Sequence, residues 1–260
     1  MWTAELTLAK AAGSLARQAI AEAQSLQVSH KGRVDLVTQI DLLSESIIRK
    51  HLSTALPEIP ILGEEEGGQA QATQWIVDPL DGTTNFVHGF PAYAISIALM
   101  VDAEIRVACI INAVNGDIYT ASQNGGAHLN DQAIRVSQVK TLNDALLLTG
   151  FPYDRQQKAP IYLRLVERFM RCAQGIRRAG SAALDFAHIA AGRADGYWEL
   201  GLSPWDIAAG VLLVSEAGGL VTDMEGNKLD IYAPRLLVSN AQIHQDMIHV
   251  IQEANLALNS

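Results

Sequence analysis

The segment WIVDPLDGTTNF, from Trp75 to Phe86, is the stretch that most constrains the fold. It begins as an apolar strand, WIV, which leads directly into two aspartates, Asp78 and Asp81. Like charges at close range repel each other, and each carboxylate loses hydration when it is partly buried. Stability alone does not favour two carboxylates at the end of a packed strand. We therefore expect this strand end to bind a ligand.

A second acidic cluster, Glu64 to Glu66 in GEEEGG, follows another short apolar strand, Ile61-Leu62. From His51 to Ile105 the sequence contains no lysine and no arginine. If the two strands are neighbours, their carboxylates meet at one sheet edge, and either distant basic residues or metal ions must balance them. Hard oxygen donors with water suit Mg²⁺. The histidines and cysteines form no ligand-spaced cluster that indicates zinc.

The residues that follow Asp81 add an anion-binding feature. Gly82, Thr83 and Thr84 stand at a predicted helix start, where free backbone N–H groups can bind an anion. Metal ligands and a phosphate cradle within one stretch favour hydrolysis of a phosphate ester.

Each motif also has a simpler structural interpretation. D-P-x-D-G is typical of a turn, and GEEEGG is typical of a solvated acidic loop. Thr38 and Asp41 have the spacing of a capping box that opens a helix. Asp206 fits the first turn of a helix, where the helix dipole favours an acid. The joint occurrence of these motifs at strand ends and helix starts favours the functional interpretation.

The pattern of elements indicates two halves. Apolar residues at helical spacing predict helices near residues 3–27 and from about 38 to 56. Short strands follow and predict an α+β first half with an antiparallel sheet. Strands and helices alternate after about residue 140, which predicts a mixed α/β second half. We predict domains at residues 1–140, with most metal ligands, and 141–260, with Asp206 and the substrate contacts.

Composition narrows the class of protein. Of 260 residues, 49% are hydrophobic and 18% are charged, which is typical of a globular protein. The net charge of −9 argues against a broad nucleic-acid surface or an anionic membrane partner. Cys109 and Cys172 are expected to be buried free thiols in a reducing compartment. The charged N-terminal segment lacks the apolar stretch of a signal peptide, so we expect a cytoplasmic protein.

Two long motifs make the sequence resemble the inositol monophosphatase family. One is WIVDPLDGTTNF, and the other is WDIAAGVLLVSEAGG, from Trp205 to Gly219. DLVTQID, GEE and GSAALD also occur in the family's order. The resemblance implies a layered αβαβα sandwich, an Mg²⁺-dependent phosphomonoesterase with two or three ions per active site, inhibition by lithium, and a homodimer.

The resemblance also implies roles for particular residues. The implied metal ligands are Glu64, Asp78, the backbone carbonyl of Leu80, Asp81 and Asp206. The implied catalytic residues are Glu64, Thr83, which would position the attacking water, and Asp41, hydrogen-bonded behind Thr83. The implied phosphate contacts are the backbones of Gly82 and Thr83. The implied substrate contacts are Asp81, Gly180, Ser181, Ala182, Glu199 and Asp206.

Ser181 stands where animal members of the family often carry threonine, and RRAGSAALD and SPWD are more similar to bacterial members. The expected substrate is myo-inositol 1-phosphate, with histidinol phosphate, fructose 1,6-bisphosphate or a nucleotide 3′-phosphate as alternatives. A non-catalytic interaction protein on the same scaffold is the alternative of another class. The complete acidic set argues against it. Because crowded carboxylates repel, we also expect Asp81→Asn to cost no stability without metal.

Overall fold

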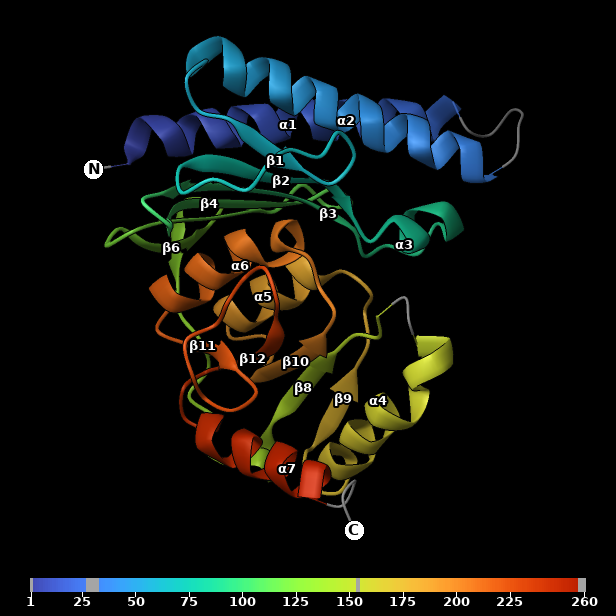
Figure 1. The fold of residues 1–260 in the computed structure, drawn as a ribbon, viewed down its shortest axis with the longest axis vertical. Helices are drawn as coiled ribbons and strands as arrows, with labels where there is room; N and C mark the ends of the chain where they lie inside the picture. Colours follow the sequence, from blue (N-terminus) through green and yellow to red (C-terminus); the bar gives the residue numbers. More distant parts are fainter. Residues whose placement is uncertain (1, 27–32, 153–154, 257–260) are drawn as a thin grey trace.

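Alternating layers of helices and sheets make up the protein (Figure 1). The structure, a computed structural model, describes residues 2–26, 33–152 and 155–256. One outer layer consists of α1 (Thr3–Leu26) and α2 (Arg33–Ala55), which cover the first sheet. A middle layer of α5 (Ala182–Ala190) and α6 (Pro204–Glu216) separates the two sheets. The other outer layer consists of α4 (Arg155–Met170) and α7 (His244–Leu256). This order is the predicted αβαβα sandwich.

The first sheet contains seven strands in the order of the sequence. They are β1 (Ile61–Gly63), β2 (Gln74–Asp81), β3 (Ala94–Val101), β4 (Glu104–Asn112), β5 (Ile118–Ser122), β6 (Gly126–Leu129) and β7 (Gln132–Ile134). β1 pairs with β2 in parallel, and the other pairs are antiparallel. The predicted antiparallel sheet is thus confirmed, apart from its first pair. The short helix α3 (Thr83–His88) follows β2 directly.

The second sheet has the strand order β11-β12-β10-β8-β9. Its strands are β8 (Leu146–Thr149), β9 (Gly175–Arg177), β10 (Gly196–Leu200), β11 (Leu220–Asp223) and β12 (Arg235–Ser239). β8 pairs in parallel with β9 and β10, whereas β12 pairs antiparallel with β10 and β11. The predicted mixed sheet is confirmed. The two sheets divide near residue 140, and the division of the chain into two domains stays a prediction.

Apolar side chains fill the spaces between the layers. Along β2, Trp75 and Val77 pack in the cluster under α1 and α2, whereas Ile76 packs in the cluster between the two sheets. A third cluster, which includes Phe169 and Trp198, lies between the second sheet and the outer helices α4 and α7. Both faces of β2 are buried, and its run Trp75–Val77 is apolar without alternation, as in fully buried strands. The layers therefore hold the end of β2 rigidly between α2 and the α5–α6 pair.

The start of the second helix differs from the prediction. Helix α2 begins at Arg33, so Thr38 lies inside it and not at its N-cap. The capping-box interpretation of Thr38 and Asp41 was therefore wrong, because the apolar pattern continues upstream of the T-x-x-D spacing. Residues 27–32, which include the predicted end of the first helix, lie outside the described residues.

Both cysteines are free, as predicted, although only Cys109 is fully buried and Cys172 is half-buried. Burial raises the pKa of the Cys109 thiol to about 12, so this thiol stays protonated at neutral pH. In the part of the chain that the structure describes, no helix combines the length and apolar character needed to cross a bilayer.

Candidate active site

A β-bulge brings the two aspartates of β2 to the same side of the sheet. The strand continues through both residues: Asp78 pairs with Ser96 and Asp81 pairs with Ala94, so three steps on β2 match two on β3. Residues two apart on a strand face the same way, so Asp78 and Asp81 share the face of Ser96 and Ala94. Pro79 lies within the bulge, where a strand tolerates proline. The Ser44 hydroxyl of α2 donates to the Pro79 carbonyl at 2.8 Å.

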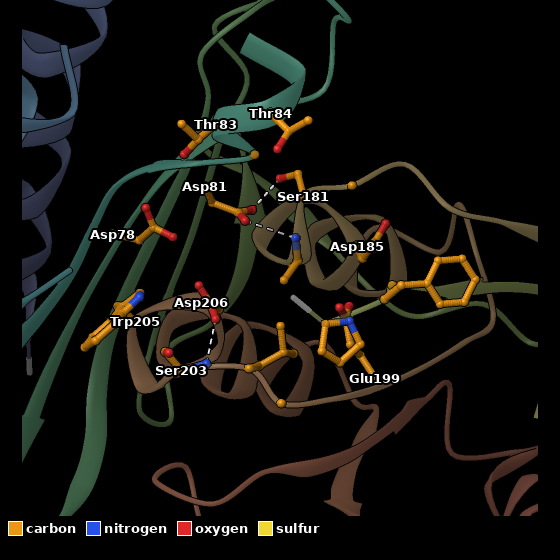
Figure 2. A pocket seen from close by; sticks show the side chains of 18 of the residues that line it. Asp78, Asp81, Thr83, Thr84, Ser181, Asp185, Glu199, Ser203, Trp205 and Asp206 are labelled. Atoms are coloured by element: carbon orange, nitrogen blue, oxygen red, sulfur yellow. Dashed lines mark hydrogen bonds between the residues drawn. The ribbon is translucent and has the colours of Figure 1, made fainter. Parts of the chain in front are cut away.

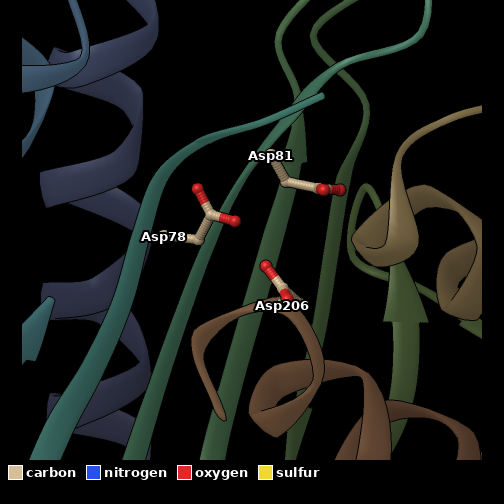
Figure 3. A group of neighbouring side chains, drawn as sticks. All are labelled: Asp78, Asp81 and Asp206. Atoms are coloured by element: carbon tan, nitrogen blue, oxygen red, sulfur yellow. The ribbon is translucent and has the colours of Figure 1, made fainter. Parts of the chain in front are cut away.

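The first turn of α6 contributes the third aspartate. Figure 3 shows Asp206 pointing from this turn toward Asp78 and Asp81. One carboxylate oxygen from each of the three residues lies within 4.8 Å of the others. The Ser203 N–H donates to Asp206 Oδ2 at 2.6 Å, which fixes the carboxylate at the helix start. Asp206 is therefore both a first-turn acid and a member of the predicted metal site.

Asp81 also joins the first sheet to α5 (Figure 2). Ser181 Oγ and the Ala183 N–H, at 2.8 Å, both donate to Asp81 Oδ2, and the Ala182 N–H donates to Oδ1 at 3.2 Å. These donors form the N-terminus of α5, where the helix dipole favours a negative charge. The predicted substrate contacts Gly180, Ser181 and Ala182 thus lie beside the acidic cluster. The expectation that Asp81→Asn costs no stability omitted this link.

Burial raises the pKa of each carboxyl in the cluster, and repulsion by neighbouring carboxyls adds to it at Asp78 and Asp206. Asp78 is 1% exposed, and its pKa is raised well above the usual range by burial and then by Glu64, Asp81 and Asp206. Burial and Asp81 raise the pKa of Asp206 to about 7. Burial raises the pKa of Asp81 to about 6, although the α5 donors act in the opposite direction.

Glu64 lies next to Asp78 because β1 and β2 run in parallel, with Gly63 opposite Val77. Glu64 is exposed at the edge of the cavity. Its carboxyl group is nevertheless partly desolvated, and this desolvation, with repulsion from Glu65 and Asp81, raises the pKa of Glu64 to about 7. Its carboxylate lies outside the 4.8 Å group of Asp78, Asp81 and Asp206 but lines the same cavity. Such a set of hard oxygen donors with uncompensated negative charge fits Mg²⁺.

Gly82 turns the chain from β2 into α3. Its φ is +92°, and a Cβ at this position would lie 2.8 Å from the Ala92 carbonyl oxygen, so only glycine fits. Thr83 then begins the helix, and its hydroxyl donates to the Leu80 carbonyl at 3.0 Å. Both residues line the cavity, as the phosphate-binding prediction requires.

Asp41 of α2 is buried and is not among the residues that line the cavity. Its Oδ1 atom has no hydrogen-bond partner, and burial together with Glu65 raises its pKa to about 7. The implied hydrogen bond between Asp41 and Thr83 is not formed here, because the Thr83 hydroxyl donates to Leu80 instead.

The cavity extends from the acidic cluster toward β10 and has a volume of about 340 Å³. At its far end Glu199 is buried and accepts a hydrogen bond from Tyr197 Oη at 2.6 Å. Burial raises the pKa of Glu199 to about 7. Gly150 gives the carboxylate space, because a Cβ there would lie 2.0 Å from Glu199 Oε2.

Sequence reasoning missed two residues at this end. Asp185 lines the cavity, is 1% exposed and has an Oδ1 atom without a hydrogen-bond partner. Its pKa is raised by burial and by Glu199. Asp185 stands four positions after Ser181, the N-cap of α5, and this i,i+4 spacing on one helical face could have identified it. Arg178 is the one lysine or arginine among the described residues that line the cavity.

The fold and the site together define an αβαβα protein with a carboxylate-rich cavity between its two sheets. The chain belongs to the inositol monophosphatase family, whose sequence profile matches residues 1–256.

Individual relatives agree with this assignment. The chain is 47% identical to an inositol-1-monophosphatase of Rhizobium meliloti, over 94% of this chain and 92% of the relative. It is 39% identical to a protein of Vibrio cholerae named Nus factor SuhB, over 96% and 95% of the two chains. Among solved structures, an inositol monophosphatase from Anabaena superposes with a TM-score of 0.88 at 36% identity and covers 96% of both chains.

Proposed function

We propose that this protein hydrolyses small phosphate monoesters in an Mg²⁺-dependent reaction, with myo-inositol 1-phosphate as the substrate that fits best. The observation that carries the proposal is the cluster of Asp78, Asp81 and Asp206, whose oxygens converge beside the hydroxyl of Thr83. Family membership and the relative named inositol-1-monophosphatase support it.

Four carboxylates and one carbonyl would hold the metal: Glu64, Asp78, Asp81, Asp206 and Leu80 O. The first four lie at the cavity as acids with raised pKa values, and a bound cation would favour their ionised forms and release their protons to solvent. Bound Mg²⁺ supplies Lewis-acid chemistry, which neutralises negative charge on the phosphoryl oxygens and on the leaving group.

The other residues bind and orient the reactants. The backbone N–H groups of Gly82 and Thr83 hold the phosphate at the start of α3. In the proposed reaction the Thr83 hydroxyl turns from the Leu80 carbonyl and donates to Asp41. The Thr83 oxygen then accepts a hydrogen bond from the attacking water and so orients it. Gly180, Ser181, Ala182 and Glu199 contact the hydroxyl groups of the substrate. Glu199 is a hydrogen-bond acceptor at the end of a cavity whose volume of about 340 Å³ suits a small polyol phosphate.

A substrate panel tests this function. Phosphate release is measured with myo-inositol 1-phosphate, histidinol phosphate, fructose 1,6-bisphosphate and a nucleotide 3′-phosphate, each with Mg²⁺ and with a chelator. We expect the highest kcat/KM for the inositol phosphate, no turnover in chelator, and inhibition by lithium but not by sodium. A higher kcat/KM for another ester would identify that ester as the substrate in place of myo-inositol 1-phosphate. Turnover in chelator would exclude the metal-dependent mechanism.

The relative named Nus factor SuhB favours a second candidate function, a binding role that does not need catalysis. Asp78→Asn separates the two roles, because it should abolish phosphate release and leave a binding role intact. We also propose a cytoplasmic homodimer, which light scattering would report as twice the chain mass of 28.0 kDa.

A further inference from the structure

An ion pair of α2, formed by Glu45 and Arg49, binds the acidic loop that follows β1, residues 64–68. Arg49 Nε lies 2.7 Å from Glu45 Oε1, and Glu45 is fully buried. Glu45 Oε2 accepts a hydrogen bond from the Glu65 N–H at 2.8 Å, and Oε1 accepts one from the Glu66 N–H at 3.1 Å. A single carboxylate therefore binds the two backbone amides that follow Glu64.

Arg49 links the same loop to the start of β1. Its Nη2 atom donates to the Gly67 carbonyl at 2.7 Å, and its Nη1 atom donates to the Ile61 carbonyl at 3.3 Å. Its Nε atom also lies 3.4 Å from Glu66 Oε2. A distant basic residue thus balances the Glu66 end of the acidic cluster. Among the described residues, no cation contributes in this way to Asp78, Asp81 or Asp206.

Gly63 shows how closely the loop approaches this pair. A Cβ at residue 63 would lie between 2.2 and 2.8 Å from the carboxylate atoms of Glu45. A side chain at residue 63 would displace the Glu45 carboxylate, and this explains why the first residue of GEEEGG is glycine. On the other side, the Glu64 N–H donates to the Val77 carbonyl of β2 at 3.2 Å. The backbone of Glu64 is thereby fixed from both sides, with its side chain at the cavity.

We propose that Glu45 and Arg49 are positioning residues that hold the Glu64 carboxylate where it binds the metal, and so set the affinity of the cavity for Mg²⁺ without contact with the ion. This inference rests on the proposed function. Neither residue lines the cavity, and both form hydrogen bonds with backbone groups around the loop. Partners that orient metal ligands from behind commonly change metal affinity by about 10- to 100-fold when removed.

The test uses Glu45→Gln and Arg49→Lys, with Glu167→Gln as a matched control. Glu167 and Arg171 form an ion pair of the same i,i+4 spacing and the same 2.7 Å distance on exposed α4, without contacts to the loop. In Glu45→Gln the amide NH₂ group meets an N–H donor, so one backbone hydrogen bond is lost. Arg49→Lys keeps the charge but loses the forked contacts.

Mg²⁺ affinity is measured by calorimetry, and amide hydrogen exchange is measured at Glu65 and Glu66. We expect Glu45→Gln to weaken Mg²⁺ binding by about 10- to 100-fold, with a smaller change in Arg49→Lys and none in Glu167→Gln. Exchange at the two amides should be slow in the wild type and faster in Glu45→Gln. The KM for substrate at saturating Mg²⁺ should stay near the wild-type value.

Three results would overturn the positioning role. One is wild-type Mg²⁺ affinity in folded Glu45→Gln, which would reduce the pair to a stabilising contact. Another is rapid exchange of the Glu65 and Glu66 amides in the wild type, a result that does not depend on any variant folding. The third is a wild type that binds no Mg²⁺, in which case the proposed function fails together with the positioning role.

Discussion

Thr83 is the residue whose hydroxyl has one clear role in the structure and a different one in the proposed reaction. In the structure it donates to the Leu80 carbonyl at 3.0 Å. If it orients water during catalysis, Thr83→Ala should lower kcat by about 10²- to 10⁴-fold with little change in KM. Thr83→Ser should restore most of the rate. An unchanged kcat in Thr83→Ala would show that the hydroxyl only ties the start of α3 to Leu80.

Glu199 allows a separate prediction about specificity. Glu199→Gln keeps an acceptor for Tyr197 Oη but removes the charge that faces the substrate. Hydrogen bonds to charged groups contribute about 1.5–3 kcal/mol, so KM for a polyol phosphate should rise at least about tenfold. Hydrolysis of p-nitrophenyl phosphate, which has no hydroxyls, serves as the control and should change little. Loss of Mg²⁺ binding would instead identify Glu199 as a metal ligand.

At the scale of elements, the contacts between β2, α5 and α6 assemble the cluster. Asp78 accepts a hydrogen bond from the Leu80 N–H at 2.9 Å, and Glu64, Asp81 and Asp206 repel its charge. Asp81 accepts three from the start of α5. The two aspartates, three positions apart on one strand, are therefore a matched pair for separating repulsion from hydrogen bonding.

Without metal, Asp78→Asn should melt above the wild type, because it removes a buried charge from a repulsive cluster. Asp81→Asn should melt below Asp78→Asn, because its amide group places N–H donors against the donors of α5. The lost charged hydrogen bonds should cost Asp81→Asn about 1.5–3 kcal/mol of stability. At about 2–4 °C per kcal/mol, the melting temperatures of the two variants should differ by about 3–12 °C. Thermal melts in chelator measure it. Equal melting temperatures would show that the link between Asp81 and α5 adds no stability.

Local sequence predicted the elements and the membership of the cavity, but not how the elements are supported. The strand before Asp78, the helix start after Gly82 and the acid at Asp206 follow from short-range patterns. The bulge at Pro79 depends on the register between β2 and β3, and the Glu45 contacts depend on α2 packing under a loop about twenty residues away. Such long-range contacts leave no periodic signal in a single sequence. Asp185 ends the motif GSAALD, but only the fold shows that this residue lines the cavity.

At the scale of the whole molecule, the raised carboxyl pKa values couple stability to pH. Asp41, Glu64, Asp206 and Glu199 have pKa values of about 7, and Asp81 of about 6. When the folded state raises the pKa of an acid, ionisation of that acid favours the unfolded state. The contribution of the acid to the free energy of unfolding is therefore present at low pH and is lost as pH rises through these values. Half-buried His188 and buried His244 have pKa values that burial lowers, so these two residues act in the opposite direction.

The carboxyls outnumber the histidines, so metal-free protein should melt at a higher temperature at pH 5 than at pH 8. Mg²⁺ should stabilise it more at pH 8, where the ligands are already ionised. At about a hundred times Kd this gain is about 2.7 kcal/mol, or about 5–11 °C for a chain of this size. Melts across pH with and without Mg²⁺ measure both effects. A metal-free melting temperature that rises steadily from pH 5 to pH 8 would mean that the cluster does not carry these protons.

The most direct measurement is phosphate release from myo-inositol 1-phosphate across a Mg²⁺ titration, for the wild type and Asp78→Asn at equal concentration. Asp78 is the most deeply buried of the three converging aspartates, and its replacement is not expected to unfold the protein. We predict no release without Mg²⁺, saturable activation in the wild type, and a rate at least about 100-fold lower in Asp78→Asn at every Mg²⁺ concentration. Equal rates in the two proteins, or release by the wild type in chelator, would contradict an Mg²⁺-dependent phosphatase site at the end of β2.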